Sequence, residues 1–329
     1  MRWIDRLISA GRQTVKTATL FAVDAPTASS GKSLLTETVG IITTGHKPTM
    51  MSQGKSPEED EKRLSAVLMS GDSVIVIDNC DRQVEGDFLC TMLTQEFVIA
   101  RILGKSEVIR LPTNALVMAT GNNLALAGDV TRRALICRLD TGEERPDLLQ
   151  HSFDPREEVL AERPELVVAG LTVLRGYITA GKPTSLGTIG SYEKWNVVRE
   201  ALVWLGHTDP VATRERIMAD DPRKGELIDL LRLWFDALGT EQVTLGDLAK
   251  KVDSRAGARV TSLVGELIAK TRHGNFNARS IGRYLSKQVD RVVAGFVLRV
   301  DTDASGVKHY RVQVSAALPP PMPEDDSPF

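Results

Sequence analysis

The chain has 329 residues, of which 42% are hydrophobic and 26% are charged. This length and composition fit two or three domains with packed cores and exclude a disordered protein. The formal net charge is −2, so a protein that binds nucleic acid over its whole surface is excluded, and any DNA site must be a local basic patch.

Residues 1–10 are basic and amphipathic, and no long apolar segment follows them as in a signal peptide. No apolar run reaches the roughly 18 residues of a membrane span. Cys80, Cys90 and Cys137 show neither a metal-binding nor a disulfide spacing. We interpret them as reduced thiols and expect a cytoplasmic protein that does not contact membranes.

The first half of the chain has the pattern of an α/β fold. Apolar runs bounded by turn residues predict strands, and the segments between them have helical periodicity. The predicted strands cover residues 17–23, 73–77, 108–111, 115–120 and 134–139. Strands that alternate with helices favour a mainly parallel sheet with helices on both faces.

The pattern changes after Gly142, where a polar connector begins. Residues 160–180 predict a helical hairpin or one long helix, 181–190 a loop, and 192–205 a helix with an apolar stripe. Because each lies in such a stripe, Trp195, Trp204 and Trp234 are expected in the core and not in base stacking.

The last third predicts helices followed by a β-hairpin, which is the order of a winged helix. The turn between the two strands lies at residues 301–306. The predicted helices are 227–238, 245–251, 261–271 and 278–289, and the predicted strands are 292–300 and 309–314. The expected domains are a motor (1–142), a helical linker or lid (143–220), a winged-helix-like DNA-binding domain (221–316) and a disordered tail (317–329).

Residues 25–33 follow a predicted strand and precede the helical run 34–42, which is the context of a phosphate-binding loop. Backbone N–H groups at such a helix start point at phosphate oxygens. Lys32 would neutralise the β- and γ-phosphates of ATP, and the Ser33 hydroxyl would ligate Mg²⁺. The expected nucleotide contacts are Pro26, Thr27, Ala28, Ser29, Ser30, Gly31, Lys32, Ser33 and Leu34.

One position departs from the usual phosphate-loop pattern. Pro26 replaces the first glycine, and proline neither reaches positive φ nor has an N–H to donate. The entry to the loop is therefore expected to differ in shape. Without its context, the run Gly31, Lys32 and Ser33 would equally fit a chance turn before a helix.

A phosphate loop needs a second strand that ends in an acid. Asp78 follows the apolar residues 74–77 and is expected to hold Mg²⁺, through water. Where such ATPases often place a glutamate that orients water, this chain has Asn79. Asp81 is therefore our candidate general base, and Asn79 would orient the attacking water. An acid at a strand end is also frequent at simple turns, and the pairing with Lys32 favours the metal role.

Polar residues after the next strands complete the set. Asn122 follows residues 116–120 and can hydrogen-bond the γ-phosphate or the attacking water. Arg132 and Arg133 come shortly afterwards, and a guanidinium suits phosphate because it is always charged and can form paired hydrogen bonds. Taken alone, the two arginines would fit a solvated basic turn.

The phosphate loop, the acid at the strand end, the asparagine and the arginine pair follow one another in the chain. Their order resembles the AAA+/superfamily 3-like helicase module of phage and prophage primase–helicase proteins. The likeness is strong over the first half of the chain and weaker beyond it. It is carried by residues 25–35, 77–81, 119–123 and 126–139. The resemblance implies a P-loop ATPase that hydrolyses ATP with Mg²⁺ and works as a homo-oligomeric, hexameric ring on single-stranded DNA, in replication of a phage or mobile element.

The resemblance also implies roles for single residues. Asn122 would be the polar sensor, and Arg132 or Arg133 the arginine finger that reaches the nucleotide of the adjacent subunit. A primase region often precedes the motor in such proteins, which makes a separate primase a candidate partner and the chain a fragment or a stand-alone version.

Pore contacts with DNA have two candidate locations. One set lies between the phosphate loop and Asp78, namely Gln53, Lys55, Lys62 and Arg63. The other set is Arg101 and Lys105, before the sensor. An exposed loop at 52–55 and a helix start capped by Ser56 with Pro57 would explain the first set equally well.

The tail offers a basic helical face for duplex DNA. Asn277 is a plausible N-cap, and Arg279, Arg283 and Lys287 recur at helical spacing, with Ile281 and Leu285 on another face. Two further cations, Lys308 and Arg311, flank the last strand. A merely solvated basic face is the alternative.

Three functions remain open. The first is an ATP-dependent DNA helicase or translocase. The second is an origin-binding initiator that uses ATP to assemble and unwinds little, which Asn79 favours. The third is an ATP-dependent transcription regulator, ranked last because no receiver or effector domain is recognised before the motor.

Overall fold

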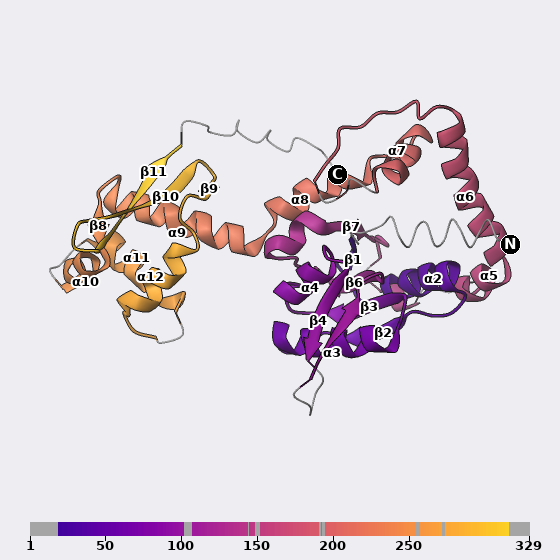
Figure 1. The fold of residues 1–329 in the computed structure, drawn as a ribbon, viewed down its shortest axis with the longest axis horizontal. Coiled ribbons are helices and arrows are strands. Elements are labelled where there is room, and N and C mark those ends of the chain that lie inside the picture. Colours follow the sequence, from indigo (N-terminus) through magenta and orange to yellow (C-terminus); the bar gives the residue numbers. More distant parts are fainter. Residues whose placement is uncertain are drawn as a thin grey trace. The chain divides into compact units, whose positions relative to one another are not determined.

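The computed structural model describes residues 19–101, 107–143, 145–148, 152–190, 192, 195–253, 257–271 and 274–315. The chain divides into two units, Met1–Pro222 and Arg223–Phe329 (Figure 1). The basic N-terminal segment 1–10 and the tail 317–329 singled out in the sequence lie outside the described residues.

The first unit is built on a five-stranded sheet with the order β2-β3-β6-β1-β7. All neighbouring strands in it are parallel, which confirms the predicted α/β fold. Since parallel strands end at the same edge, the ends of β1, β6 and β3 lie next to one another. The strands are β1 (Leu20–Ala25), β2 (Thr49–Ser52), β3 (Val74–Cys80), β6 (Leu116–Asn122) and β7 (Ala134–Arg138).

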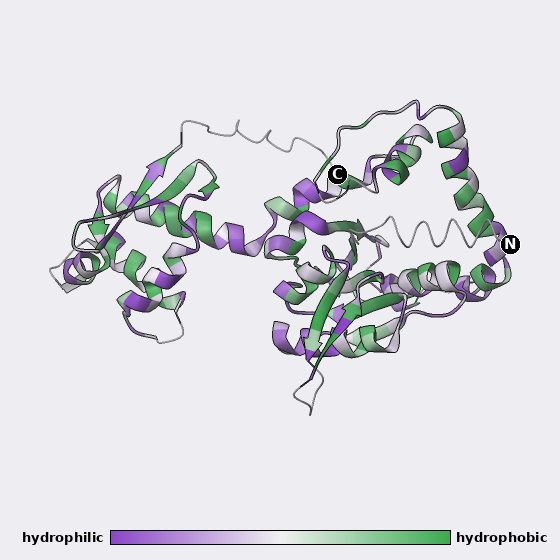
Figure 2. Cartoon of the chain, in the orientation of Figure 1, coloured by the Kyte–Doolittle hydropathy of each residue, from purple (hydrophilic) through white to green (hydrophobic). Residues whose placement is uncertain are grey.

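Helices cover both faces of this sheet. On one face, Val39 of α2 packs against Val76 and Met118. On the other face, Leu64 of α3 and Ile217 of α8 join the main core. Figure 2 shows the strands hydrophobic along much of their length, in line with the fully buried run at the start of β3. The helices are α2 (Lys32–Thr44), α3 (Pro57–Ser70), α4 (Asp87–Met92) and α8 (Thr213–Ala219).

Two strands of the first unit form a separate antiparallel pair. They are β4 (Phe97–Arg101) and β5 (Val108–Pro112). The expectation that residues 108–111 belong to the parallel sheet was therefore wrong. Val98 and Ala100 are buried and Ile99 is exposed, so this hairpin has one packed face and one open face, whereas a central parallel strand is covered on both.

The region after β7 is helical, as predicted, and its helices are α5 (Pro155–Ala161), α6 (Arg163–Thr179) and α7 (Asn196–Trp204), with short 3₁₀ turns at Pro146–Leu148 and Pro210–Ala212. α5 and α6 are separated at Glu162, because Pro164 has no N–H to continue the hydrogen bonds of α5 and is instead favourable in the first turn of α6. The prediction that Trp204 lies in the core was wrong. It is 39% exposed, because it lies in the last turn of α7 and is covered on one side by Tyr177, at 5.8 Å between ring centroids.

The second unit combines helices with a four-stranded antiparallel sheet of order β8-β11-β10-β9. All four predicted helices are present, and so is the hairpin of β10 and β11. The elements are α9 (Pro222–Leu238), β8 (Val243–Thr244), α10 (Leu245–Asp253), α11 (Ala258–Ala269), α12 (Ala278–Ser286), β9 (Val292–Val293), β10 (Phe296–Thr302) and β11 (Lys308–Val314).

The core of the second unit forms around Trp234, which is fully buried as predicted. Its ring lies 6.5 Å from that of Tyr310 in β11. The β10–β11 turn is held by Asp303, whose Oδ1 accepts from the N–H groups of Ser305 and Val307, both at 2.9 Å. Among the described residues, no helix is long and apolar enough to cross a membrane.

Candidate functional site

The predicted phosphate loop leaves β1 at Ala25 and enters α2 at Lys32. Gly31 has φ +84°, a left-handed conformation that favours glycine. Within the loop, Ser30 Oγ donates to the Thr27 carbonyl at 2.6 Å. No side chain caps the start of α2, so its first N–H groups are open to an anion. Pro26 is exposed at the entry.

The side chain of Lys32 joins the loop to β6, the strand that carries the predicted sensor Asn122. Its Nζ donates to Asn122 Oδ1 at 2.7 Å and to the Thr27 carbonyl at 2.9 Å. The register explains the contact, since Ala25 at the end of β1 pairs with Asn122 at the end of β6. Lys32 and Asn122, predicted as separate site residues, are thus brought together at one position.

Ser33, the residue after Lys32, is in contact with Asp78. Ser33 Oγ donates to Asp78 Oδ1 at 3.0 Å, and Thr120 Oγ1 donates to the same oxygen at 2.7 Å. Thr120 was missed in the sequence, although a hydroxyl near the end of a buried apolar strand is a signal. A hydroxyl and a carboxylate oxygen side by side are hard ligands of the kind that Mg²⁺ takes in phosphate sites.

The charge of Lys32 is subject to opposing influences. Burial lowers the pKa of the Lys32 ammonium below its usual value, while Asp24 and Asp78 raise it. The lysine therefore lies in a partly desolvated position beside two carboxylates.

The loop after β3 places the two proposed water-orienting residues. Asn79 has φ +53°, and its backbone N–H donates to Thr120 Oγ1 at 3.0 Å. The β3–β6 register shifts between Ile77 and Cys80. Asp81 is exposed and forms no hydrogen bond or ion pair within the described part of the chain. The structure thus brings Asp78 together with Lys32, Ser33 and Asn122 in what we call the Lys32 cluster. Among the described residues, Asp81 makes no direct contact with this cluster.

Asp78 and Asp81 are expected to differ when replaced. Asp78→Asn should weaken Mg²⁺-dependent ATP binding and turnover together, because it removes the carboxylate beside Ser33. Asp81→Asn should lower turnover by about 100-fold with affinity unchanged, the effect of losing a general base. Asp236→Asn, on an exposed part of α9, is the matched control. Normal turnover in Asp81→Asn, measured by phosphate release, would place the base elsewhere.

Arg132 and Arg133 lie in a 3₁₀ turn (Gly128–Arg133) directly before β7. Both form ion pairs with Asp129, each with a different carboxylate oxygen. The Arg132 side chain is 54% exposed and that of Arg133 is 16% exposed. Arg133 also donates to the Asp129 carbonyl at 3.0 Å. Burial raises the pKa of Asp129, but the contacts with Arg132 and Arg133 outweigh this effect and lower the pKa below its usual value. Arg132 is thus the more accessible of the two cations.

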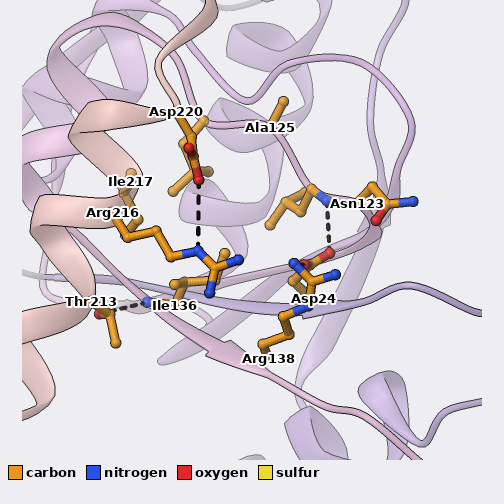
Figure 3. A pocket seen from close by; sticks show the side chains of 11 residues that line it. Asp24, Asn123, Ala125, Ile136, Arg138, Thr213, Arg216, Ile217 and Asp220 are labelled. Atoms are coloured by element: carbon orange, nitrogen blue, oxygen red, sulfur yellow. Dashed lines mark hydrogen bonds and ion pairs between the residues drawn. The ribbon is translucent and has the colours of Figure 1, made fainter. Parts of the chain in front are cut away.

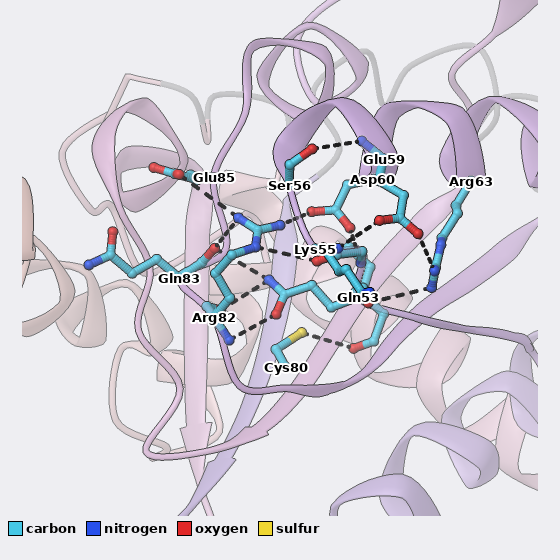
Figure 4. Close-up of polar contacts among 12 residues, drawn as sticks. Gln53, Lys55, Ser56, Glu59, Asp60, Arg63, Cys80, Arg82, Gln83 and Glu85 are labelled. Carbon is cyan, nitrogen blue, oxygen red and sulfur yellow. Dashed lines mark hydrogen bonds and ion pairs between the residues drawn. The ribbon is translucent and has the colours of Figure 1, made fainter. Parts of the chain in front are cut away.

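Part of the first set of pore candidates lies in a structural network (Figure 4). Gln53 Nε2 donates to the Arg82 carbonyl and its Oε1 accepts from the Arg82 N–H, both at 3.0 Å. Arg63 donates to the Ser52 carbonyl at 2.7 Å and pairs with Glu59. These contacts favour the structural interpretation for Gln53 and Arg63, whereas Lys55 and Lys62 are exposed.

Asp60 is the centre of the same network. It is buried, accepts from the Gly54 N–H at 2.6 Å and pairs with Arg82. Arg82 also donates to the Gly54 carbonyl at 3.4 Å. The loop between β2 and α3 is therefore tied to the loop that follows β3.

The second set of pore candidates lies on the β4–β5 hairpin. Arg101 is exposed at the end of β4, while Lys105 lies outside the described residues. On the open face, the Arg110 guanidinium stacks over the ring of Phe97, at 3.9 Å from its centroid. Ile99 beside it is 70% exposed. The hairpin thus presents cations next to apolar surface.

The basic residues of the second unit lie as the helical spacing predicts. Arg279, Arg283 and Lys287 are exposed, while Ile281 and Leu285 are fully buried. Among the described residues, none forms an ion pair with these three cations. Asn277 caps α12, accepting from the Ser280 N–H at 3.0 Å.

A shallow groove lies beside this helical face. It runs between α12, the start of α10 and the start of β11, and its cations are Arg279, Arg283 and Lys308. Arg311 differs, because it is half-buried on β11 and lies 3.5 Å from Asp301. Lys308 is therefore the better placed of the two predicted β11 cations.

A buried acid beside the phosphate loop was missed in the sequence. Asp24 is 3% exposed and accepts from the Leu124 N–H at 2.7 Å. It also lines a pocket whose apolar wall includes Leu124 and Ile217 and whose rim carries Arg138 and Arg216 (Figure 3). The available signal was an acid inside an apolar strand run.

The last residue of β3, Cys80, is buried. Burial raises the pKa of the Cys80 thiol to about 12, and Asp60 and Asp78 add to the effect, so the thiol stays neutral. Within the described segments, no three His, Cys, Asp or Glu side chains are grouped so that they could hold a metal ion. Ser33 and Asp78 would therefore supply only part of a magnesium shell, with phosphate and water as the other ligands.

No protein-family model matches this chain, and no curated protein matches it either. A function is therefore inferred from the geometry of the Lys32 cluster and of the basic surfaces.

Proposed function

We propose that the chain is an ATP-hydrolysing DNA translocase or helicase with a P-loop motor related to the AAA+ and superfamily 3 helicases. The observation that carries the proposal is the meeting of Lys32, Asn122, Ser33 and Asp78 at one edge of the parallel sheet. A cation, a sensor amide and a hydroxyl–carboxylate pair beside a helix start are the groups that phosphoryl transfer requires.

Each group of this cluster has a role in the proposed reaction. The start of α2 binds the phosphates, Lys32 neutralises charge on the β- and γ-phosphates, and Asn122 holds the γ-phosphate or the attacking water. Ser33 and Asp78 would hold Mg²⁺, which supplies charge stabilisation for the transferred phosphoryl group. Because β6 lies between β1 and β3, the end of β6 that carries Asn122 lies next to both the end of β1 and the strand of Asp78.

DNA contact is proposed at two surfaces. The open face of the β4–β5 hairpin carries Arg101 and the stacked pair of Phe97 and Arg110, which suits single-stranded DNA because bases stack on rings and guanidinium planes. In the second unit, the α12 face and its groove suit the phosphates of a duplex. The order of α10–α12 followed by the β10–β11 hairpin supports a winged-helix-like domain there.

A ring is proposed because Arg132 is exposed and bound to Asp129 alone among the described residues. In a ring of identical subunits, this arginine would reach the nucleotide of the neighbour, as the helicase resemblance implies. The proposal includes a homo-hexamer and a phage or mobile-element replication role, with a primase as a candidate partner.

An ATP-dependent initiator is the second candidate function. It is favoured by Asn79 in the place of a catalytic glutamate and by the absence of direct contacts between Asp81 and the cluster among the described residues. Such a protein would bind ATP and assemble on DNA with slow turnover.

Strand displacement separates these two functions. A forked DNA duplex is incubated with the wild-type protein, Mg²⁺ and either ATP or a non-hydrolysable analogue. The translocase proposal requires strand displacement with ATP and none with the analogue. ATP-dependent assembly in size-exclusion chromatography without displacement would support the initiator instead.

The basic face of α12 gives a prediction for duplex binding. Three phosphate contacts correspond to a log–log salt slope of roughly −2.7. Replacing Arg279, Arg283 and Lys287 with alanine should flatten the slope of the wild-type protein by about this amount without unfolding the domain, because Ile281 and Leu285 stay buried. The measurement is fluorescence anisotropy over a salt series.

The control for this prediction removes the same charge elsewhere on the second unit. Arg232, Lys250 and Arg259 are exposed and lie outside the α12 groove. Their triple alanine variant should keep the wild-type slope. Equal slopes for wild type and both variants would mean that the α12 face is merely solvated.

A further inference from the structure

The conformation of the sensor turn depends on a buried carboxylate of the neighbouring strand. Asp24 is the second-last residue of β1, and its side chain is 3% exposed. Its Oδ1 accepts from the backbone N–H of Leu124, two residues after the sensor, at 2.7 Å. Leu124 is itself buried, at 8% exposed. An N–H in this position has little access to water as an alternative partner.

Two further contacts hold the same turn. The N–H of Asn123 donates to the Ala25 carbonyl at 3.1 Å. Gly121 lies so close to β3 that a Cβ would approach the Cys80 carbonyl to 2.6 Å. The turn is therefore bound to β1 on one side and pressed against β3 on the other, with Asn122 between. Asn123 has φ +50°, a strained conformation for a residue other than glycine that these contacts must maintain.

The ion pair beside Asp24 is the weaker of its contacts. Arg138 Nη1 lies 3.8 Å from Asp24 Oδ2, and the Arg138 side chain is 46% exposed. Asp24 is buried, but solvent screens the half-exposed guanidinium at this distance, so the pair is weaker than the hydrogen bond to Leu124. The short hydrogen bond to Leu124, drawn as a dashed line in Figure 3, is the contact that fixes the turn.

We propose that Asp24 is a positioning residue of the ATPase site, which holds the turn after β6 so that Asn122 meets Lys32 and the γ-phosphate. This inference rests on the proposed function. Asp24 acts through Leu124 and Asn122 and is not assigned a contact with the nucleotide. Since Asn122 serves the reacting phosphate more than the rest of ATP, loss of its position should affect kcat more than ATP binding.

Two substitutions at this position separate the hydrogen bond from the charge. Asp24→Asn retains an oxygen that accepts from Leu124, whereas Asp24→Ala leaves that N–H without its partner. We expect Asp24→Ala to lower kcat by about 10- to 100-fold, the size of effect seen for small displacements of a catalytic group, with ATP affinity changed by less than about threefold. Asp24→Asn and Arg138→Ala should stay close to wild type.

The experiment combines turnover with a direct readout of the turn. ATP hydrolysis, ATP-analogue binding and amide hydrogen exchange at Leu124 are measured for wild type and the three variants. The inference requires fast exchange and low kcat in Asp24→Ala alone. Unchanged kcat in Asp24→Ala, or an equal loss in Asp24→Asn, would overturn it while leaving the ATPase assignment intact. Absence of turnover in wild type would overturn the proposed function, and the inference with it.

Discussion

Lys32→Ala should lower ATP turnover by about 100-fold or more, the effect expected when a preorganised charge on a reacting phosphate is removed. Lys32 is the cation that contacts Asn122, at 2.7 Å, in the cluster that also contains Ser33 and Asp78. The alanine variant leaves the two acids of the site, Asp24 and Asp78, without this neighbouring positive charge. ATP affinity should fall as well, because the lysine contacts the phosphates in the ground state too.

The measurement is phosphate release at saturating ATP, with thermal unfolding as a check on the fold. Lys32 is only partly buried, so its truncation should leave the core intact. Lys250→Ala removes an exposed lysine of the second unit and serves as the matched control. Turnover in Lys32→Ala close to that of wild type would refute the phosphate-loop assignment.

Arg132→Ala should lower turnover by roughly 1,000-fold, as expected for the loss of an arginine finger. The reason is the difference in accessibility within the pair. Arg132 is the exposed cation, whereas Arg133 is mostly buried and also bonded to a backbone carbonyl. Arg132 can leave Asp129 for a phosphate at a subunit interface, while Arg133 has a structural place in the 3₁₀ turn.

A mixing experiment tests whether Arg132 acts on a neighbour. Subunits with Lys32→Ala lack a working site but keep the arginine, and subunits with Arg132→Ala have the reverse defect. Mixed rings should regain turnover that neither variant has alone. Arg145→Ala, which removes an exposed arginine paired with Asp147, is the control. No regain in mixtures that form stable oligomers would mean that Arg132 does not act between subunits.

The parts of the site that the sequence predicts are those with local signals. Lys32, Ser33 and Asp78 were identified because a strand, a loop and a helix start follow one another in the chain. The basic face of α12 was found because buried Ile281 and exposed Arg283 follow helical periodicity. Both predictions need only a few neighbouring residues.

The parts that the sequence does not predict depend on contacts between distant residues. The hydrogen bond of Asp24 joins residues 100 positions apart, so an acid inside an apolar strand run does not by itself show which group it binds. β2 was not foreseen because its four residues, Thr49–Ser52, are too few for a clear periodicity. β5 was assigned to the wrong sheet because its partner, β4, was not foreseen either.

The sequence also does not predict the ion-pair partners of the charged residues. Asp129 precedes the two arginines in the chain, but only the 3₁₀ turn brings its two oxygens to separate guanidinium groups. Arg311 was expected at a DNA surface, and its position on β11 leaves it half-buried beside Asp301.

The proposed function requires that the Lys32 cluster hydrolyse ATP in response to DNA. The direct test is the rate of Mg²⁺-dependent ATP hydrolysis by the wild-type protein, measured over a range of single-stranded DNA concentrations beside Lys32→Ala prepared in the same way. We predict a rate that rises and saturates with DNA in wild type and stays at background in the variant. A wild-type rate that is at background, or that does not respond to DNA, would contradict the proposed function.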